Sequence, residues 1–235
     1  MRVVSLVPSA TETLVALGVT PVAVTRFCDL PGVATVGGTK NPNIAEIVAL
    51  APDLVVVNDE ENRADDAFAL ADAGLTVHSM SPRSVAEVAF EVRGLAEQVG
   101  VLAPEPFVDE WDDWLASVLS PRYWDAFVAV WRRPYMSLAK DTYGASLLDL
   151  LGVGNVFGDS LDRYPEVTLD EVAARAPNVV LLPSEPYVFT ETHVAEVQAV
   201  IGNVPVLLVD GRDLFWWGIR PPAAAERLRQ SLTLS

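Results

Sequence analysis

The feature that most constrains the fold is a segment that occurs twice. Residues 44–60 and 169–185 align without a gap at an offset of 125 residues, and six of the 17 positions are identical. Most of the other positions exchange one apolar side chain for another, and both copies end on a glutamate, Glu60 and Glu185. Two copies are too few for a solenoid, which needs about three repeats or more. The repeat therefore predicts two similar lobes.

Strand and helix patterns alternate along the whole chain. Val3–Val7 and Leu54–Val57 are short apolar runs typical of buried strands, and Ser84 with Glu87 forms a capping box that begins a helix of about four turns. This alternation predicts an α/β fold: two Rossmann-like lobes with mainly parallel sheets, joined by a long helix, with a ligand cleft between the lobes. The predicted boundaries are 1–83 for the N-terminal α/β lobe, 84–120 for a helical connector and 121–235 for the C-terminal α/β lobe.

A second landmark shows that the two lobes are not identical. The tripeptide LGV closes the first predicted helix of each lobe, at 17–19 and at 151–153, which is an offset of 134 residues. The repeat has an offset of 125, so the lobes differ by nine residues between these landmarks.

Composition excludes several classes of protein. A formal net charge of −16 on 235 residues argues against nucleic-acid binding, which needs a basic surface. Cys28 is the only cysteine, so no intramolecular disulfide can form, and it has no zinc-ligand spacing with His78 or His193. No apolar run approaches the 18 residues of a membrane span.

Catalytic motifs have no clear match. GVGNVFG (152–158) has one residue too many for a dinucleotide loop and follows a predicted helix, whereas such loops follow a strand. No P-loop and no G-x-S-x-G motif is present. The acidic residues 59–66 could hold a metal ion, but we favour a solvated loop that leads into a helix N-terminus, where the dipole favours Asp and Glu. We therefore predict no catalytic residue and no metal site.

Aromatic and arginine residues gather in the segments expected beyond the strand ends. In open parallel sheets, ligands bind beyond the carboxyl ends of the strands, where aromatic side chains give large rigid contact surfaces. The alternative is that these side chains only cover the end of a sheet. The segments are Phe27, WRRPY (131–135), Asp141–Tyr143, DRYPE (162–166) and LFWWGIRPP (214–222).

An ordered set of motifs resembles a known family. LVPSATE, FCDLP, PDLVVVNDEEN, GVGNVFGD, YPEV and SEPYVF together are similar to the helical-backbone substrate-binding proteins of ABC importers, in particular the cobalamin-binding branch related to ferric-siderophore and haem binders. The resemblance implies a non-enzymatic monomer that binds a metal-chelate ligand in the interlobe cleft, most of all a corrinoid, with no cofactor built in. Ferric-siderophore or haem binding by the same fold is an alternative. A cytoplasmic carrier or enzyme that reuses the scaffold is another.

The resemblance also implies site residues by position. In the first lobe the ligand-binding residues would be Ser9, Ala10, Phe27, Asp29 and Asn58. In the second lobe they would be Arg133, Tyr135, Tyr164, Phe215, Trp217 and Arg220. Glu60 or Glu61 in one lobe and Glu185 in the other would meet arginines on an ABC permease dimer, so the repeat would be a two-point dock.

The cellular compartment that the sequence predicts is the one feature in which it departs from this family. Members that feed a permease are exported or lipid-anchored, whereas MRVVSLVPSATE leads directly into the first strand, and Cys28 does not lie in a lipidation motif. The sequence therefore predicts a cytoplasmic location unless an export signal has been removed.

Overall fold

The computed structural model describes residues 1–233 and divides into two compact units. Unit 1 contains Met1–Pro82, Glu87–Trp111 and Trp217–Ile219. Unit 2 contains Arg83–Ala86, Asp112–Trp216 and the chain from Arg220 onward. The residues predicted as a connector, 84–120, are thus divided between the units, and a three-residue segment near the C-terminus belongs to unit 1.

Unit 1 is built on a parallel five-stranded sheet with the order β3-β2-β1-β6-β7. Its strands are β1 (Val3–Ser5), β2 (Ala23–Val24), β3 (Ala34–Thr35), β6 (Leu54–Val57) and β7 (Val77–Ser79), and a small antiparallel ladder pairs β4 (Gly37–Gly38) with β5 (Asn41–Pro42). Its helices are α1 (Pro8–Ala16), α2 (Ile44–Ala49) and α3 (Ala64–Asp72), and most of α4 (Val85–Gln98) also belongs to it.

Unit 2 is built on a parallel four-stranded sheet with the order β11-β8-β13-β14. Its strands are β8 (Trp124–Val128), β11 (Val153–Asn155), β13 (Val179–Pro183) and β14 (Val206–Val209). A small antiparallel sheet joins β9 (Trp131–Arg132), β10 (Tyr135–Met136) and β12 (Glu166–Val167). The helices are α5 (Trp111–Val118), α6 (Tyr143–Leu150), α7 (Leu169–Ala174), α8 (Glu191–Ile201), α9 (Gly211–Phe215) and α10 (Pro221–Thr233).

The repeated segment folds alike in the two units. In each it forms a short helix, α2 or α7, followed by a strand, β6 or β13, that lies between the unit's first and last parallel strands. Ala51 and Ala176 occupy the same position between helix and strand, and both have a left-handed backbone, with φ of 43° and 50°. The predicted α/β fold with mainly parallel sheets is confirmed.

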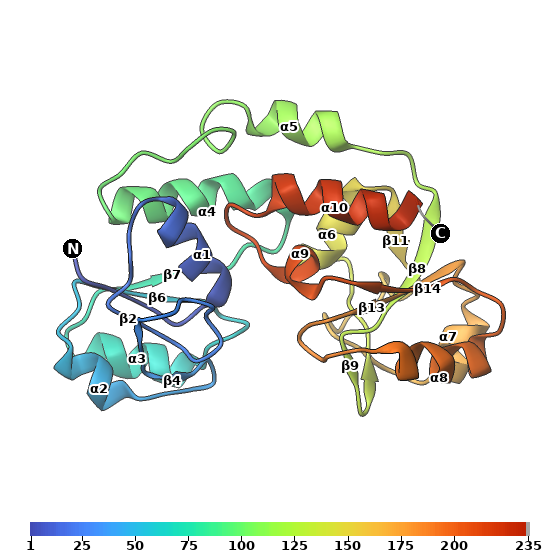
Figure 1. Ribbon diagram of the computed structural model, residues 1–235, viewed down its shortest axis with the longest axis horizontal. Coiled ribbons are helices and arrows are strands. Elements are labelled where there is room, and N and C mark those ends of the chain that lie inside the picture. The colour runs from blue at the N-terminus through green and yellow to red at the C-terminus, as the bar shows by residue number, and fades with distance from the viewer. Residues whose placement is uncertain (234–235) are drawn as a thin grey trace. The chain divides into compact units, whose positions relative to one another are not determined.

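The alternating strand residues build a core on the face of each sheet that the repeated helix covers. In unit 1, Val4 and Val55 pack with Ile47 of α2 and Leu70 of α3. The corresponding core of unit 2 brings together Phe127, Val172, Val180, Leu182 and Val197, from two strands and from α7 and α8. Figure 1 shows α7 and α8 on one side of the unit 2 sheet and α6, α9 and α10 on the other.

Some local structure differs from the sequence-based expectation. The segment 131–135, expected to be a loop, forms the β9–β10 hairpin, and part of the predicted loop 214–222 lies in α9. The extra residues of unit 1 between LGV and the repeat include β3 and the β4–β5 ladder. Within residues 1–233, no helix is both long enough and apolar enough to cross a membrane.

Candidate functional site

The carboxyl edge of the unit 2 sheet gathers four segments, because its four strands run parallel. The segments follow β8, β11, β13 and β14, and side-chain contacts join them. Ser137, in the segment after β8, accepts a hydrogen bond from Asn155 Nδ2 at 3.0 Å, and the Trp131 ring meets the Tyr187 ring edge-on with centroids 5.5 Å apart. Of the segments that the sequence predicted to converge, these contacts involve one, WRRPY (131–135), through Trp131.

Glu185, predicted to dock a permease, binds two residues of the next segment. Arg212 Nε donates to its Oε1 at 3.2 Å, and the Trp216 indole N–H donates to its Oε2 at 3.0 Å. About a third of the side chain, 35%, stays exposed. Neither Arg212 nor Trp216 was predicted to contact Glu185, and no sequence signal links residues 27 and 31 positions apart.

Helix α9, which contains Arg212, also carries a buried carboxylate, Asp213. Arg220 donates to its Oδ1 at 2.9 Å, and Arg227 donates to both its oxygens at 2.6 Å. Burial alone would raise the pKa of Asp213, but the hydrogen bonds from Arg227 and Arg220 outweigh burial and lower it. Nearby, the buried phenol of Tyr143 has a raised pKa because of desolvation. Arg220, a predicted ligand-binding residue, is therefore held from within unit 2.

A second polar cluster joins the β9–β10 hairpin to α8. Tyr135 donates to Glu196 Oε1 at 3.0 Å, and Arg132 binds the other carboxylate oxygen. Burial, with the hydrogen bond to Glu196, raises the pKa of Tyr135 to about 12, and the hydrogen bond from Arg132 lowers that of Glu196. The Tyr135 hydroxyl, predicted to bind ligand, thus has a partner within its own unit.

The other predicted residues of the second lobe lie in different surroundings. Arg133 is exposed in the turn of the hairpin, and Tyr164 is half-buried with the Arg163 guanidinium 5.8 Å from its ring centre. Phe215 ends α9, and its ring lies close to Gly144 at the start of α6. Trp217 belongs to unit 1 and is only 5% exposed.

In unit 1 the predicted residues follow the carboxyl ends of β1 and β2. Ser9 and Ala10 lie in the first turn of α1 and are buried, and the Ser9 hydroxyl has no hydrogen-bond partner in the structure. Phe27 is 53% exposed under the Arg26 guanidinium, and Asp29 is also exposed.

Asn58 holds the turn that follows β6. Its amide nitrogen donates to the Met80 carbonyl at 2.7 Å, and its Oδ1 accepts from the backbone N–H groups of Glu60 and Glu61 at 2.8 and 2.9 Å. Asn58 therefore presents the two predicted docking glutamates. Glu60 is exposed, and its carbonyl accepts a hydrogen bond from Lys40 Nζ at 2.5 Å. In the described part of the chain, residues 1–233, no group of three or more His, Cys, Asp or Glu side chains is placed to hold a metal ion.

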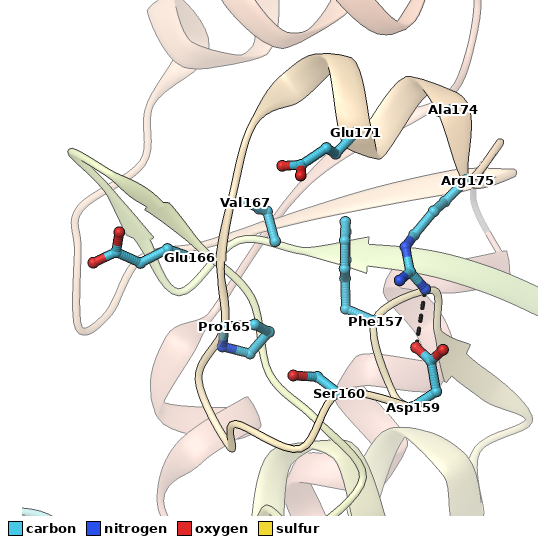
Figure 2. Close-up of a pocket in the computed structure, with 9 residues that line it drawn as sticks. All are labelled: Phe157, Asp159, Ser160, Pro165, Glu166, Val167, Glu171, Ala174 and Arg175. Atoms are coloured by element: carbon cyan, nitrogen blue, oxygen red, sulfur yellow. Dashed lines mark hydrogen bonds and ion pairs between the residues drawn. The ribbon is translucent and has the colours of Figure 1, made fainter.

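Unit 2 also contains a pocket of about 520 Å³ that the sequence did not indicate. Figure 2 shows its lining, with the Phe157 ring between Val167 and the Arg175–Asp159 ion pair. The Arg175 guanidinium lies 4.5 Å from the centre of the Phe157 ring, and Glu171 accepts hydrogen bonds from Thr168. None of the predicted ligand-binding residues lines this pocket.

Two α/β units, each with a parallel sheet and with polar and aromatic side chains beyond its strand ends, are the architecture of a two-lobed binding protein. The sequence matches the periplasmic binding protein family over residues 3–201, and the chain belongs to this family. This confirms the family resemblance of the motifs.

Individual relatives show which binding proteins of this family the chain is similar to. Vitamin B12-binding proteins of Vibrio cholerae and Salmonella choleraesuis are 27% and 28% identical in alignments of 190 residues. These alignments cover 76% and 77% of this chain and 69% and 71% of the two relatives. The crystal structure of the periplasmic vitamin B12 binding protein of Vibrio cholerae superposes with a TM-score of 0.81 at 23% identity, covering 99% of this chain and 96% of that one. A periplasmic heme-binding protein in complex with two hemes gives 0.81 at 21% identity, covering 99% and 97%. These superpositions establish the fold.

Proposed function

We propose that this protein is a substrate-binding protein of an ABC-type importer and binds a metal-chelate ligand, a corrinoid such as cobalamin. The observation that carries the proposal is the similarity to vitamin B12-binding proteins over three-quarters of the chain, at 27–28% identity. Side chains suited to a large planar ligand support it, since Phe27 and Arg133 are both exposed beyond strand ends. The role is binding without catalysis, and the metal arrives inside the ligand.

A fluorescence titration tests this proposal. Purified protein, which contains six tryptophans, is titrated with hydroxocobalamin, with haem and with a ferric siderophore, and the quenching is corrected for ligand absorbance. Tight, saturable quenching by hydroxocobalamin is expected. Saturable quenching by haem or the siderophore instead would replace the corrinoid with that ligand class. No binding of any of the three would favour the alternative of a cytoplasmic carrier or enzyme that reuses this scaffold.

Two phenylalanine variants make the titration specific to the site. Phe27→Ala removes an exposed ring beyond β2 and is expected to weaken hydroxocobalamin binding, whereas Phe90→Ala removes a ring that is 70% exposed on α4. Equal affinities of the two variants would remove Phe27 from the proposed ligand site.

The permease partner is a further part of the proposal. Glu60, which is exposed at the turn held by Asn58, would meet a basic side chain of the permease, and the compartment would then be extracytoplasmic. Pull-down of a cognate permease by the wild type but not by Glu60→Ala is the expected result. Equal recovery by both proteins would refute docking through Glu60.

A further inference from the structure

The segments that follow β13 and β14 lie in close contact. Gly211 N donates to Ser184 Oγ at 2.9 Å. A Cβ atom on Gly211 would lie 2.4 Å from the Glu185 nitrogen and 2.7 Å from its carbonyl oxygen, so only glycine fits there. This close approach places Glu185 directly against the first turn of α9.

Both carboxylate oxygens of Glu185 are used in this arrangement. Arg212 Nε binds Oε1 at 3.2 Å, and Trp216 Nε1 binds Oε2 at 3.0 Å. Hydrogen bonds to an ionised acceptor are roughly twice as strong as neutral ones, and an indole has only one N–H to donate. Glu185 therefore restricts the rotation of the Trp216 ring.

The Trp216 ring in turn contacts two guanidinium groups. The Cζ atoms of Arg212 and Arg220 lie 4.9 and 5.3 Å from its centre, within the range of a cation–π interaction. Arg220 also donates to Asp213 at 2.9 Å, and its side chain is only 16% exposed. The orientation of the indole thus contributes to the position of Arg220.

Glu60 is the repeat counterpart of Glu185. It lies in a turn whose backbone N–H groups bind Asn58, and it contacts Lys40 through its carbonyl oxygen at 2.5 Å. Glu185 contacts an arginine and an indole through its carboxylate. The repeat predicts two equivalent docking glutamates, and Arg212 and Trp216 bind the carboxylate of one of them, Glu185.

We infer that Glu185 is a positioning residue, which orients the Trp216 indole and through it Arg220. Its effect on ligand affinity rests on the proposed function and on the sequence-based prediction that Arg220 contacts the ligand. The orientation of the indole does not depend on that function, so the two parts can be tested separately.

The first test follows the indole N–H of Trp216 by NMR, with its resonance assigned from Trp216→Phe. Glu185→Ala is expected to shift this resonance upfield and to speed its exchange with solvent, and Glu185→Gln is expected to restore it in part. Asp125→Ala is the matched control, because the Asp125 carboxylate also binds an arginine, Arg122, in unit 2. The same resonance in the wild type and in Glu185→Ala would overturn the inference.

The second test is a double-mutant cycle on hydroxocobalamin affinity. Glu185→Ala and Trp216→Phe are each expected to weaken binding by about threefold or more, and the double variant by no more than either alone, since contacting residues are not additive. Additive losses of affinity would contradict the inference that Glu185 acts through Trp216. If the wild type binds no hydroxocobalamin, the proposed function fails, and the NMR measurement still decides the positioning role.

Discussion

At the scale of single residues, Asp213 carries a charge in the interior of unit 2. Its side chain is 3% exposed and accepts hydrogen bonds from Arg220 and Arg227. Removing one partner of a buried ion pair typically costs about 3–5 kcal/mol, because the remaining charges lose their compensation. We therefore expect Asp213→Ala to lower the free energy of unfolding by about that amount at pH 7, measured by urea titration.

The pH dependence of this contribution follows from the lowered pKa of Asp213. An unfolded aspartate titrates near pH 4, and the folded group titrates below that, so the stabilisation is complete above about pH 4. It is lost as the pH falls through the folded pKa. The difference in stability between the wild type and Asp213→Asn should therefore shrink at low pH. A difference that is as large at pH 2.5 as at pH 7 would contradict the assignment.

At the scale of elements, the repeated helix–strand unit ends each helix with a strained alanine. Ala176 has φ of 50°, a conformation that costs an L-residue about 1–2 kcal/mol, and Pro177 then prevents the helix from continuing. Ala176→Gly should relieve this strain and stabilise the protein by about 0.5–1 kcal/mol, after the greater freedom of glycine in the unfolded chain is subtracted.

A neighbouring alanine provides the control for that prediction. Ala174 lies in α7, also exposed, with a helical backbone. Ala174→Gly should therefore destabilise by about 0.5–1 kcal/mol. Opposite signs for the two substitutions in thermal unfolding are the expected result, and the same sign would argue against strain at Ala176.

The same elements show how far sequence patterns reach. An apolar run predicted the strand Leu54–Val57 with its observed bounds, because a strand buried on both faces needs continuous apolar residues. The run Val3–Val7 predicted a longer strand than the observed Val3–Ser5. The β9–β10 hairpin was missed, because two-residue strands are too short for a pattern to repeat. Helix α9 was missed because its five residues are too few for a helical pattern to repeat, although Asp210 caps its first turn.

At the scale of the whole molecule, the sequence located both sheet edges but not the partners of the side chains there. The shared edge could be inferred, since parallel strands place their carboxyl ends on one edge, whereas the order of the strands in each sheet was not predicted. The pairing of Glu185 with Trp216 and of Arg220 with Asp213 depends on how loops pack after folding, which no local pattern records. The ligand-binding roles of these residues stay predictions.

The return of the chain to unit 1 at Trp217–Ile219 is the other feature that spacing cannot show. Gly218 lies at the centre of this segment with φ of 83°, and a Cβ atom there would lie 2.0 Å from Thr13 Oγ1. The Thr13 hydroxyl is buried and bonded to the Ser9 carbonyl at 2.8 Å, so it has little room to move. Gly218→Ala should therefore cost about 2 kcal/mol or more in the free energy of unfolding.

Gly74→Ala, also in unit 1, is the control that distinguishes the effect of steric crowding from that of backbone strain. Its φ is 84°, but no atom lies within 4 Å of an added Cβ, so Gly74→Ala should cost only the left-handed conformation, about 1 kcal/mol. Urea titrations of the two variants, followed by circular dichroism, compare them directly. A larger loss for Gly218→Ala means that the C-terminal segment is packed into unit 1, so the last part of the chain stabilises the first. Equal losses would show that the segment moves to accommodate the added methyl group, and that its packing contributes little to the stability of unit 1.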